Sequence, residues 1–162
     1  MASSTAKRVV AYRFDRQPLE GFVYPATFLL DKSAELLSPS GSVQTVSYSE
    51  LKAICFVGEG GHFDLFQAHT LFERRPRFPG LWTRFTLRDG DQIDGVLPHN
   101  LAEWPVAGYL FTPPRPSSLR QRVFLPREAL MRTEFQAVIG SGGSRTKRVK
   151  KAAAESQLEM FE

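Results

Sequence analysis

The chain has 162 residues, 42% apolar and 23% charged, a balance that excludes wholesale disorder and favours one domain or two very small ones. A single cysteine, Cys55, excludes an intrachain disulfide and a zinc site built from cysteines. Neither an apolar run long enough to span a membrane nor a secretory signal is seen, so we expect a cytoplasmic protein without a membrane partner. The formal net charge is +4, and residues 141–162 carry five basic and three acidic side chains, which leaves the body nearly neutral.

The first part of the chain predicts short antiparallel strands. Thirteen phenylalanines, with eleven prolines and twelve glycines, are typical of β-structure interrupted by turns. Alternating apolar residues predict strands near residues 8–15, 18–24, 27–30, 34–37 and 43–57, the last with a break near Ser49.

A connector follows at residues 58–80, between a glycine-rich start and the pair Pro79-Gly80. Its middle, Phe63 to His69, fits either an edge strand or a helical turn. Further strands are predicted near residues 81–88, 91–98, 107–112, 121–125 and 131–138. The segment from Pro113 to Ser118 cannot continue a β-ladder because of its prolines.

The two halves repeat one pattern. Matching Phe14 to Leu87 gives an offset of 73 residues, and matching Gly21 to Gly95 gives 74, so we expect one extra residue in the second hairpin turn. Asp89-Gly90 predicts a type I′ turn there. Each half is interpreted as a small, strongly bent antiparallel barrel of about five strands.

Two sets of residues resemble known families. Tyr12-x-Phe14 with Leu19-Glu20-Gly21, and Phe85-x-Leu87 with Ile93-x-Gly95, resemble the first motif of Sm-like barrels. Over about residues 8–140, the chain is similar to an uncharacterised bacterial family of paired barrels, through Arg75-Pro76, Gly80-Leu81-Trp82, Pro113-Pro114 and the run 123–130. The resemblance implies an all-β fold of two tandem Sm-like or SH3-like small barrels, and it brings no assigned activity.

The expected organisation has five parts. They are an N-terminal arm at 1–7, a first barrel at 8–57, the connector at 58–80, a second barrel at 81–140 and a basic flexible tail at 141–162.

No set of residues in the sequence predicts an enzyme, a cofactor or a metal site. His62, Asp64 and His69 could supply metal ligands, but their spacing fits no single helix or strand face, so ordinary surface roles are favoured. Cys55 lies in an apolar strand and is expected to be a buried, inert thiol. Four carboxylates are expected to be solvated at hairpin turns: Glu20, Asp89, Asp91 and Asp94.

Two groups of arginines raise the question of nucleotide or nucleic-acid binding. Arg84 and Arg88 resemble the arginine pair of PilZ-type cyclic-dinucleotide receptors, but the accompanying Asp/Asn-x-Ser-x-x-Gly strand is missing, so a solvent-facing stripe is favoured. Arg74, Arg75 and Arg77 lie between Phe72 and Phe78, an interleaving of basic and aromatic residues that is typical of single-stranded nucleic-acid binders. The tail could add phosphate contacts through Lys147, Arg148, Lys150 and Lys151.

The C-terminal tail carries the most specific signal. Residues 157–161, Gln-Leu-Glu-Met-Phe, resemble the bacterial sliding-clamp-binding pentapeptide Gln-Leu-Ser/Asp-Leu-Phe. Gln157, Leu158 and Phe161 match it identically, Met160 replaces leucine with similar volume, and Glu159 departs from it. This resemblance implies a non-enzymatic accessory or adaptor protein tethered to the clamp. Three alternatives stay open: an alanine-rich C-terminal helix that docks on the body, an Sm-like module that binds single-stranded RNA, and a protein-interaction scaffold.

Overall fold

The computed structural model describes residues 5–58, 64–67, 69–116 and 121–140. In these ranges the regular structure consists of ten β-strands and two three-residue 3-10 helices, so the all-β prediction is confirmed. None of the described helices has the length and apolar character needed to cross a membrane.

Five strands come from the first half of the chain: β1 (Lys7–Arg13), β2 (Arg16–Val23), β3 (Ser33–Leu37), β4 (Val43–Ser47) and β5 (Leu51–Phe56). The predicted break near Ser49 is confirmed as a turn between β4 and β5, where the Glu50 N–H donates to the Ser47 carbonyl at 3.0 Å. The predicted strand at residues 27–30 is wrong. The segment turns back after β2, with the Phe28 N–H bound to the Tyr24 carbonyl at 3.0 Å, and its only pairing is an isolated bridge from Leu29.

The second half supplies β6 (Gly80–Leu87), β7 (Gln92–Leu97), the 3-10 helix η1 (Leu101–Glu103), β8 (Gly108–Phe111), β9 (Arg122–Pro126), the 3-10 helix η2 (Arg127–Ala129) and β10 (Leu130–Ile139). Between the halves, the described part of Phe63 to His69 contains a turn and no strand, with the Gln67 N–H bound to the Asp64 carbonyl at 3.3 Å.

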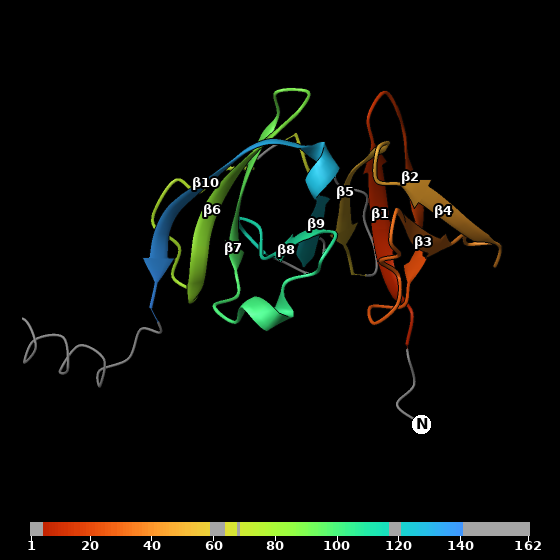
Figure 1. The fold of residues 1–162 in the computed structure, drawn as a ribbon, viewed down its shortest axis with the longest axis horizontal. Helices are drawn as coiled ribbons and strands as arrows, with labels where there is room; N and C mark the ends of the chain where they lie inside the picture. The colour runs from red at the N-terminus through yellow and green to blue at the C-terminus, as the bar shows by residue number, and fades with distance from the viewer. Residues whose placement is uncertain (1–4, 59–63, 68, 117–120, 141–162) are drawn as a thin grey trace, which may run out of the picture.

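Both halves have the same strand order (Figure 1). One curled sheet runs β4-β3-β2-β1-β5-β9-β8, and a smaller sheet runs β10-β6-β7. A bridge from Val96 to Thr112 links β7 to β8. The first half therefore reads β5-β1-β2-β3-β4 and the second β10-β6-β7-β8-β9, and the pairing of β5 with β9 joins them.

The register corrects the predicted offset between the halves. Val9 pairs with Gly21, and Thr83 pairs with Gly95, so away from the turns both strands of the first hairpin map onto the second with an offset of 74. Beside the first turn a register shift brings Arg13 opposite Arg16 and leaves two residues in that turn, against three in the second, so the expected extra residue in the second turn is confirmed. Leu87 therefore corresponds to Arg13 and not to Phe14.

The type I′ turn predicted at Asp89-Gly90 is also wrong, because only Gly90 has a positive φ, of 93°. The Gly90 N–H donates to the Leu87 carbonyl at 2.9 Å, and the Leu87 N–H donates to the Asp91 carbonyl at 2.8 Å, as in a three-residue hairpin loop.

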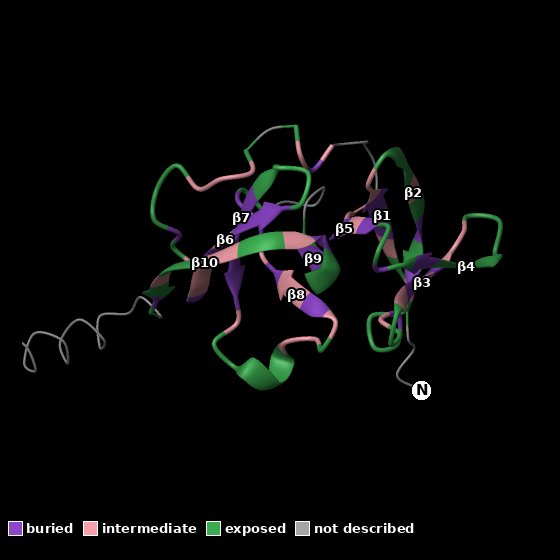
Figure 2. Ribbon diagram, turned by 45° about the horizontal axis from the view of Figure 1, so that its top comes forward, coloured by how far each residue is buried: buried purple, intermediate pink, exposed green. Residues whose placement is uncertain are grey.

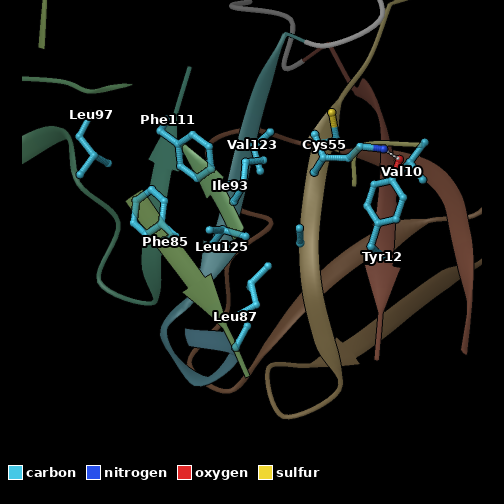
Figure 3. Packing of buried hydrophobic residues seen from close by; sticks show 13 residues of the cluster. Val10, Tyr12, Cys55, Phe85, Leu87, Ile93, Leu97, Phe111, Val123 and Leu125 are labelled. Atoms are coloured by element: carbon cyan, nitrogen blue, oxygen red, sulfur yellow. Dashed lines mark hydrogen bonds between the residues drawn. The ribbon is translucent and has the colours of Figure 1, made fainter. Parts of the chain in front are cut away.

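Three strands form a wall that is buried on both faces. From β1, Val9 and Ala11 face one core while Val10 and Tyr12 face the other, and β5 and β9 alternate in the same way. The colouring by burial shows buried runs on these strands, as it does on β7 (Figure 2). Figure 3 shows Val10, Tyr12 and Cys55 of this wall in one cluster with Phe85, Ile93 and Phe111 of the second half. Each core is therefore completed by strands of the other half.

Phe124 provides a test of this shared wall. It lies on β9, yet its fully buried ring packs in the first-half core, 6.2 Å from the ring of Phe28 and 6.3 Å from that of Tyr48. We expect Phe124→Ala to lower the free energy of unfolding by about 3–5 kcal/mol, measured by urea denaturation. Val43→Ala, at a position that is 61% exposed, is the control and should change it by less than about 0.5 kcal/mol. A loss from Phe124→Ala as small as the control's would contradict the shared wall.

Candidate functional site

A buried carboxylate anchors the connector to the second half. Asp94 on β7 is fully buried and accepts hydrogen bonds from Arg84 Nε at 2.8 Å, Trp82 Nε1 at 3.3 Å and the Phe72 backbone N–H at 2.9 Å. Its own backbone N–H donates to the Thr70 carbonyl at 2.7 Å. The hydrogen bond with Asp94 also raises the pKa of Arg84. A buried charge needs such partners, so the predicted solvated role of Asp94 is wrong.

The predicted stripe of solvent-facing arginines is confirmed for Arg88, which is exposed, and is wrong for the half-buried Arg84. Arg84 is directed at Asp94, and Arg88 lies past the end of β6. The Arg88 guanidinium carbon sits 4.1 Å from the centre of the Phe14 ring, and its nitrogens donate to the carbonyls of Glu128, at 3.3 Å, and Ser49. Both arginines thus hold parts of the fold together.

The basic residues of the connector are exposed, whereas its aromatic residues are half-buried and pack on one another. Arg74, Arg75 and Arg77 are exposed, and Arg75 Nη2 donates to the Val138 carbonyl at 3.2 Å. The half-buried Phe72 ring instead packs 5.9 Å from the Phe78 ring and 6.1 Å from the Trp82 ring. The interleaved sequence pattern therefore produces an aromatic cluster with three cations around it, and the rings pack mainly on one another.

Lys52 on β5 is the centre of a polar cluster between the halves. Its side chain is only 11% exposed, and Nζ lies 2.6 Å from Asp89 Oδ2, within hydrogen-bond distance of Asp91 Oδ2 and 4.1 Å from the centre of the Phe66 ring. The cluster ties β5 to the β6–β7 hairpin and to the connector. Asp89 and Asp91 are therefore not simply solvated, as the sequence analysis predicted.

The electrostatics of this cluster follow from its partners. Burial alone would lower the pKa of Lys52, but the hydrogen bonds and charges of Asp89 and Asp91 outweigh burial and raise it. Burial would raise the pKa of Asp89, but bonds from Lys52 and from the Asp91 backbone N–H hold it below its usual value. Both groups are stabilised in their charged forms.

A groove at the junction of the halves is the feature that sequence reasoning missed. Its volume is about 670 Å³, within the roughly 300–1,000 Å³ typical of ligand sites. Apolar side chains such as Leu30 and Val106 line it, with Asp31 and Lys32 from one half and Arg127 from the other. No motif marks these residues because they come from four separate turns.

Tyr48 forms part of this groove as a hydrogen-bond donor. Its hydroxyl donates to the Leu30 carbonyl at 2.6 Å. Burial, together with the nearby charge of Asp31, raises the pKa of Tyr48 to about 12. The phenol is therefore neutral at physiological pH, and the groove lining combines apolar side chains with charges of both signs.

The remaining candidates are distributed over the molecule. His69 Nε2 lies 3.1 Å from Arg115 Nη1, His99 Nε2 lies 3.0 Å from the Ile139 carbonyl oxygen, and Cys55 is buried as predicted. Across the described ranges, no three His, Cys, Asp or Glu side chains gather as they would to hold a metal ion. One predicted metal-ligand candidate, His62, and all the tail candidates lie outside the described residues: Lys147, Arg148, Lys150, Lys151, Gln157, Leu158, Met160 and Phe161.

The ion pair of Lys52 predicts how stability depends on pH. Because Asp89 has a lowered pKa in the folded protein, its contribution is complete above the ordinary carboxyl pKa and is lost as the pH falls through the folded value. We expect Asp89→Asn to cost about 1 kcal/mol at pH 7 and progressively less between about pH 4 and pH 2, measured by urea unfolding at each pH.

Glu103→Gln, at an exposed position in η1, is the matched control and should leave the pH profile unchanged. A difference between wild type and Asp89→Asn that stays constant with pH would contradict the ion pair.

Comparison with known proteins gives a family without a known activity. No curated protein and no solved structure matches the chain. The model of one family matches residues 5–137, which includes every described strand except the last two residues of β10. The chain belongs to that family, which is described as a family of unknown function, DUF6982.

Proposed function

We propose that the protein is a non-enzymatic adaptor whose C-terminal peptide binds the bacterial sliding clamp. The observation that carries this proposal is the sequence of residues 157–161, in which Gln157, Leu158 and Phe161 are identical to the clamp-binding pentapeptide. Such a peptide binds by an amide that hydrogen-bonds at the rim of a groove and apolar side chains that fill a preformed pocket.

The end of the β body supports this arrangement. β10 ends at Ile139, and residues 141–156 separate the body from the motif. A flexible coil of that length spans roughly 20–24 Å, enough for the body to stand clear of a partner that holds the peptide. The basic residues of the tail would then lie near DNA threaded through the clamp.

The body itself supports a binding role. We interpret its two halves, with their identical strand order, as tandem Sm-like or SH3-like small barrels. The charged clusters around Lys52 and Asp94 are engaged in structural bonds. The groove between the halves offers an adaptor a second place to bind, separate from the tail.

Calorimetry of the full chain against the sliding clamp of the source bacterium tests the proposal. We expect a dissociation constant roughly in the micromolar range, as for a single short peptide. Phe161→Ala removes a pocket-filling aromatic ring and should weaken binding by about 2 kcal/mol or more, close to thirtyfold. Lys150→Ala should weaken it by less than about threefold at low salt and not at all at high salt.

Two results would reject clamp binding. One is the lack of measurable heat with the wild-type chain at about 50 µM. The other is equal affinity of the wild type and Phe161→Ala.

Binding of single-stranded nucleic acid is the second candidate function, and the connector supports it. Arg74 and Arg77 are exposed, and among the described residues neither guanidinium group is held by a hydrogen bond or an ion pair. The adjacent Phe72 and Phe78 are half-buried, so each leaves part of its ring accessible to a base.

Titration of the full chain with a fluorescent single-stranded oligonucleotide at several salt concentrations tests this candidate. If the connector binds the backbone, Arg74→Ala with Arg77→Ala should weaken binding and reduce the salt slope by about 1–2. Lys7→Ala with Arg16→Ala removes an equal charge from exposed positions on β1 and β2 and is the matched control. Equal losses from both pairs would indicate nonspecific attraction and contradict a connector site.

A further inference from the structure

The two halves are joined by one pair of strands, and the equivalent pair of strands is left with an open edge at the two ends of the molecule. β5, the closing strand of the first half, pairs with β9, the fourth strand of the second half. The outer strands are β4, the fourth strand of the first half, and β10, the closing strand of the second. Figure 1 shows β10 and β4 at opposite ends of the folded body. One chain therefore has an open closing strand, β10, and an open fourth strand, β4, which are equivalent to the two strands that pair in the internal joint.

The internal joint shows what such a pairing buries. It has three antiparallel residue pairs, from Ile54–Phe124 to Phe56–Arg122. Ile54, Cys55, Val123 and Phe124 are all fully buried there. A short ladder of backbone hydrogen bonds is thus combined with closely packed apolar side chains on both faces.

The open strand β10 has core-facing apolar residues that the described part of the chain leaves more than half exposed. Phe135 pairs with the fully buried Thr83, and Val138 pairs with Leu81, which packs against the second-half core. Directly paired residues share a face of the sheet, so Phe135 and Val138 point to the core side. They are nevertheless 57% and 64% exposed.

Neither edge is fully protected against pairing. β4 contains no charged residue or proline, its register with β3 is regular, and Val43 is 61% exposed. β10 has register shifts on either side of Arg132–Phe135, which leaves a regular ladder of four residues, and Arg132 and Glu134 pair with each other at 3.3 Å. Natural proteins usually block an exposed edge strand with charges, prolines or a covering segment. Among the described residues, the side chains that bond to the backbone of β10 are Arg75, at the Val138 carbonyl, and His99, at the Ile139 carbonyl, both near the end of the strand.

We propose that the chain associates head to tail with a second copy of itself, β10 of one copy pairing antiparallel with β4 of the next. This contact repeats the internal β5–β9 joint and places Val43 of the second copy near Phe135 and Val138. The contact is heterologous, because different surfaces meet, so it forms a closed ring or an open chain of copies. Both forms are outcomes of the same pairing.

Sedimentation equilibrium of the full chain over a concentration series tests the proposal. The wild type should exceed the 18.2 kDa mass of one chain as its concentration rises. Val43→Asp and Phe135→Asp should each reduce self-association at least tenfold, because a charge is placed in an apolar contact. Leu101→Asp is the control, since Leu101 in η1 is 68% exposed and lies on neither edge strand, and it should leave the mass unchanged.

Mixing the variants identifies the geometry. The Val43→Asp chain keeps an intact β10 edge and the Phe135→Asp chain keeps an intact β4 edge, so an equimolar mixture should form a dimer and nothing larger. If Phe135→Asp lowers the melting temperature by more than a few degrees, Val138→Asp replaces it in the same mixture.

Three results would overturn the proposal. The first is a wild-type mass that stays at that of one chain up to about 1 mM. The second is a mixture of the two variants that stays monomeric while the wild type associates. The third is continued association of either variant alone, which would indicate a symmetric contact. Phe161→Ala should associate as the wild type does, so this test is independent of clamp binding.

Discussion

The burial of one wall of strands on both faces is the constraint on which the rest of the structure depends. β1, β5 and β9 each alternate their side chains between two cores, so every position from Val9 to Tyr12 is buried. Ala11 and Ala53 lie on this wall, one facing each core, and both are fully buried. A larger residue at either position would overpack the core that it faces. Neither half can be removed without exposing apolar surface of the other, so the two repeats behave as one folded body.

The charged residues have a role in this body that follows from the wall. Part of the connector packs against the wall, because Leu65 is fully buried in the second-half core and its N–H donates to the Tyr12 hydroxyl at 3.1 Å. Asp94 fixes the connector through the Phe72 N–H, and Lys52 fixes the neighbouring turn by lying over the Phe66 ring. These bonds use buried or half-buried charges whose partners come from different parts of the chain, so they specify how the halves are placed as well as stabilising them.

The sequence predicts local pairing well and long-range pairing poorly. Alternation around Gly21 and Gly95 located both hairpins, because a half-buried strand has a two-residue period. The same reasoning predicted that Asp89, Asp91 and Asp94 are solvated, because they lie at or near a hairpin turn. That prediction failed because other parts of the chain pack over this hairpin. Their partners Lys52 and Phe72 lie at least 22 positions away in sequence. The groove that contains Tyr48 and Val106 was not predictable for the same reason, since it exists only once the halves are joined.

The repeat also explains why polar and apolar positions differ between equivalent strands. β9 presents Phe124 to the first-half core, whereas β4, its counterpart, presents threonine and valine to solvent. Likewise Ile54 of β5 is fully buried, whereas Phe135 of β10 is more than half exposed. The internal joint is apolar, as a permanent interface is. The outer edges, β4 and β10, mix polar and apolar residues, as expected of a surface that is exposed to water in the single chain and buried when two copies associate. An array of such copies would hold many C-terminal peptides close together, so weak binding of each peptide would add up through effective concentration.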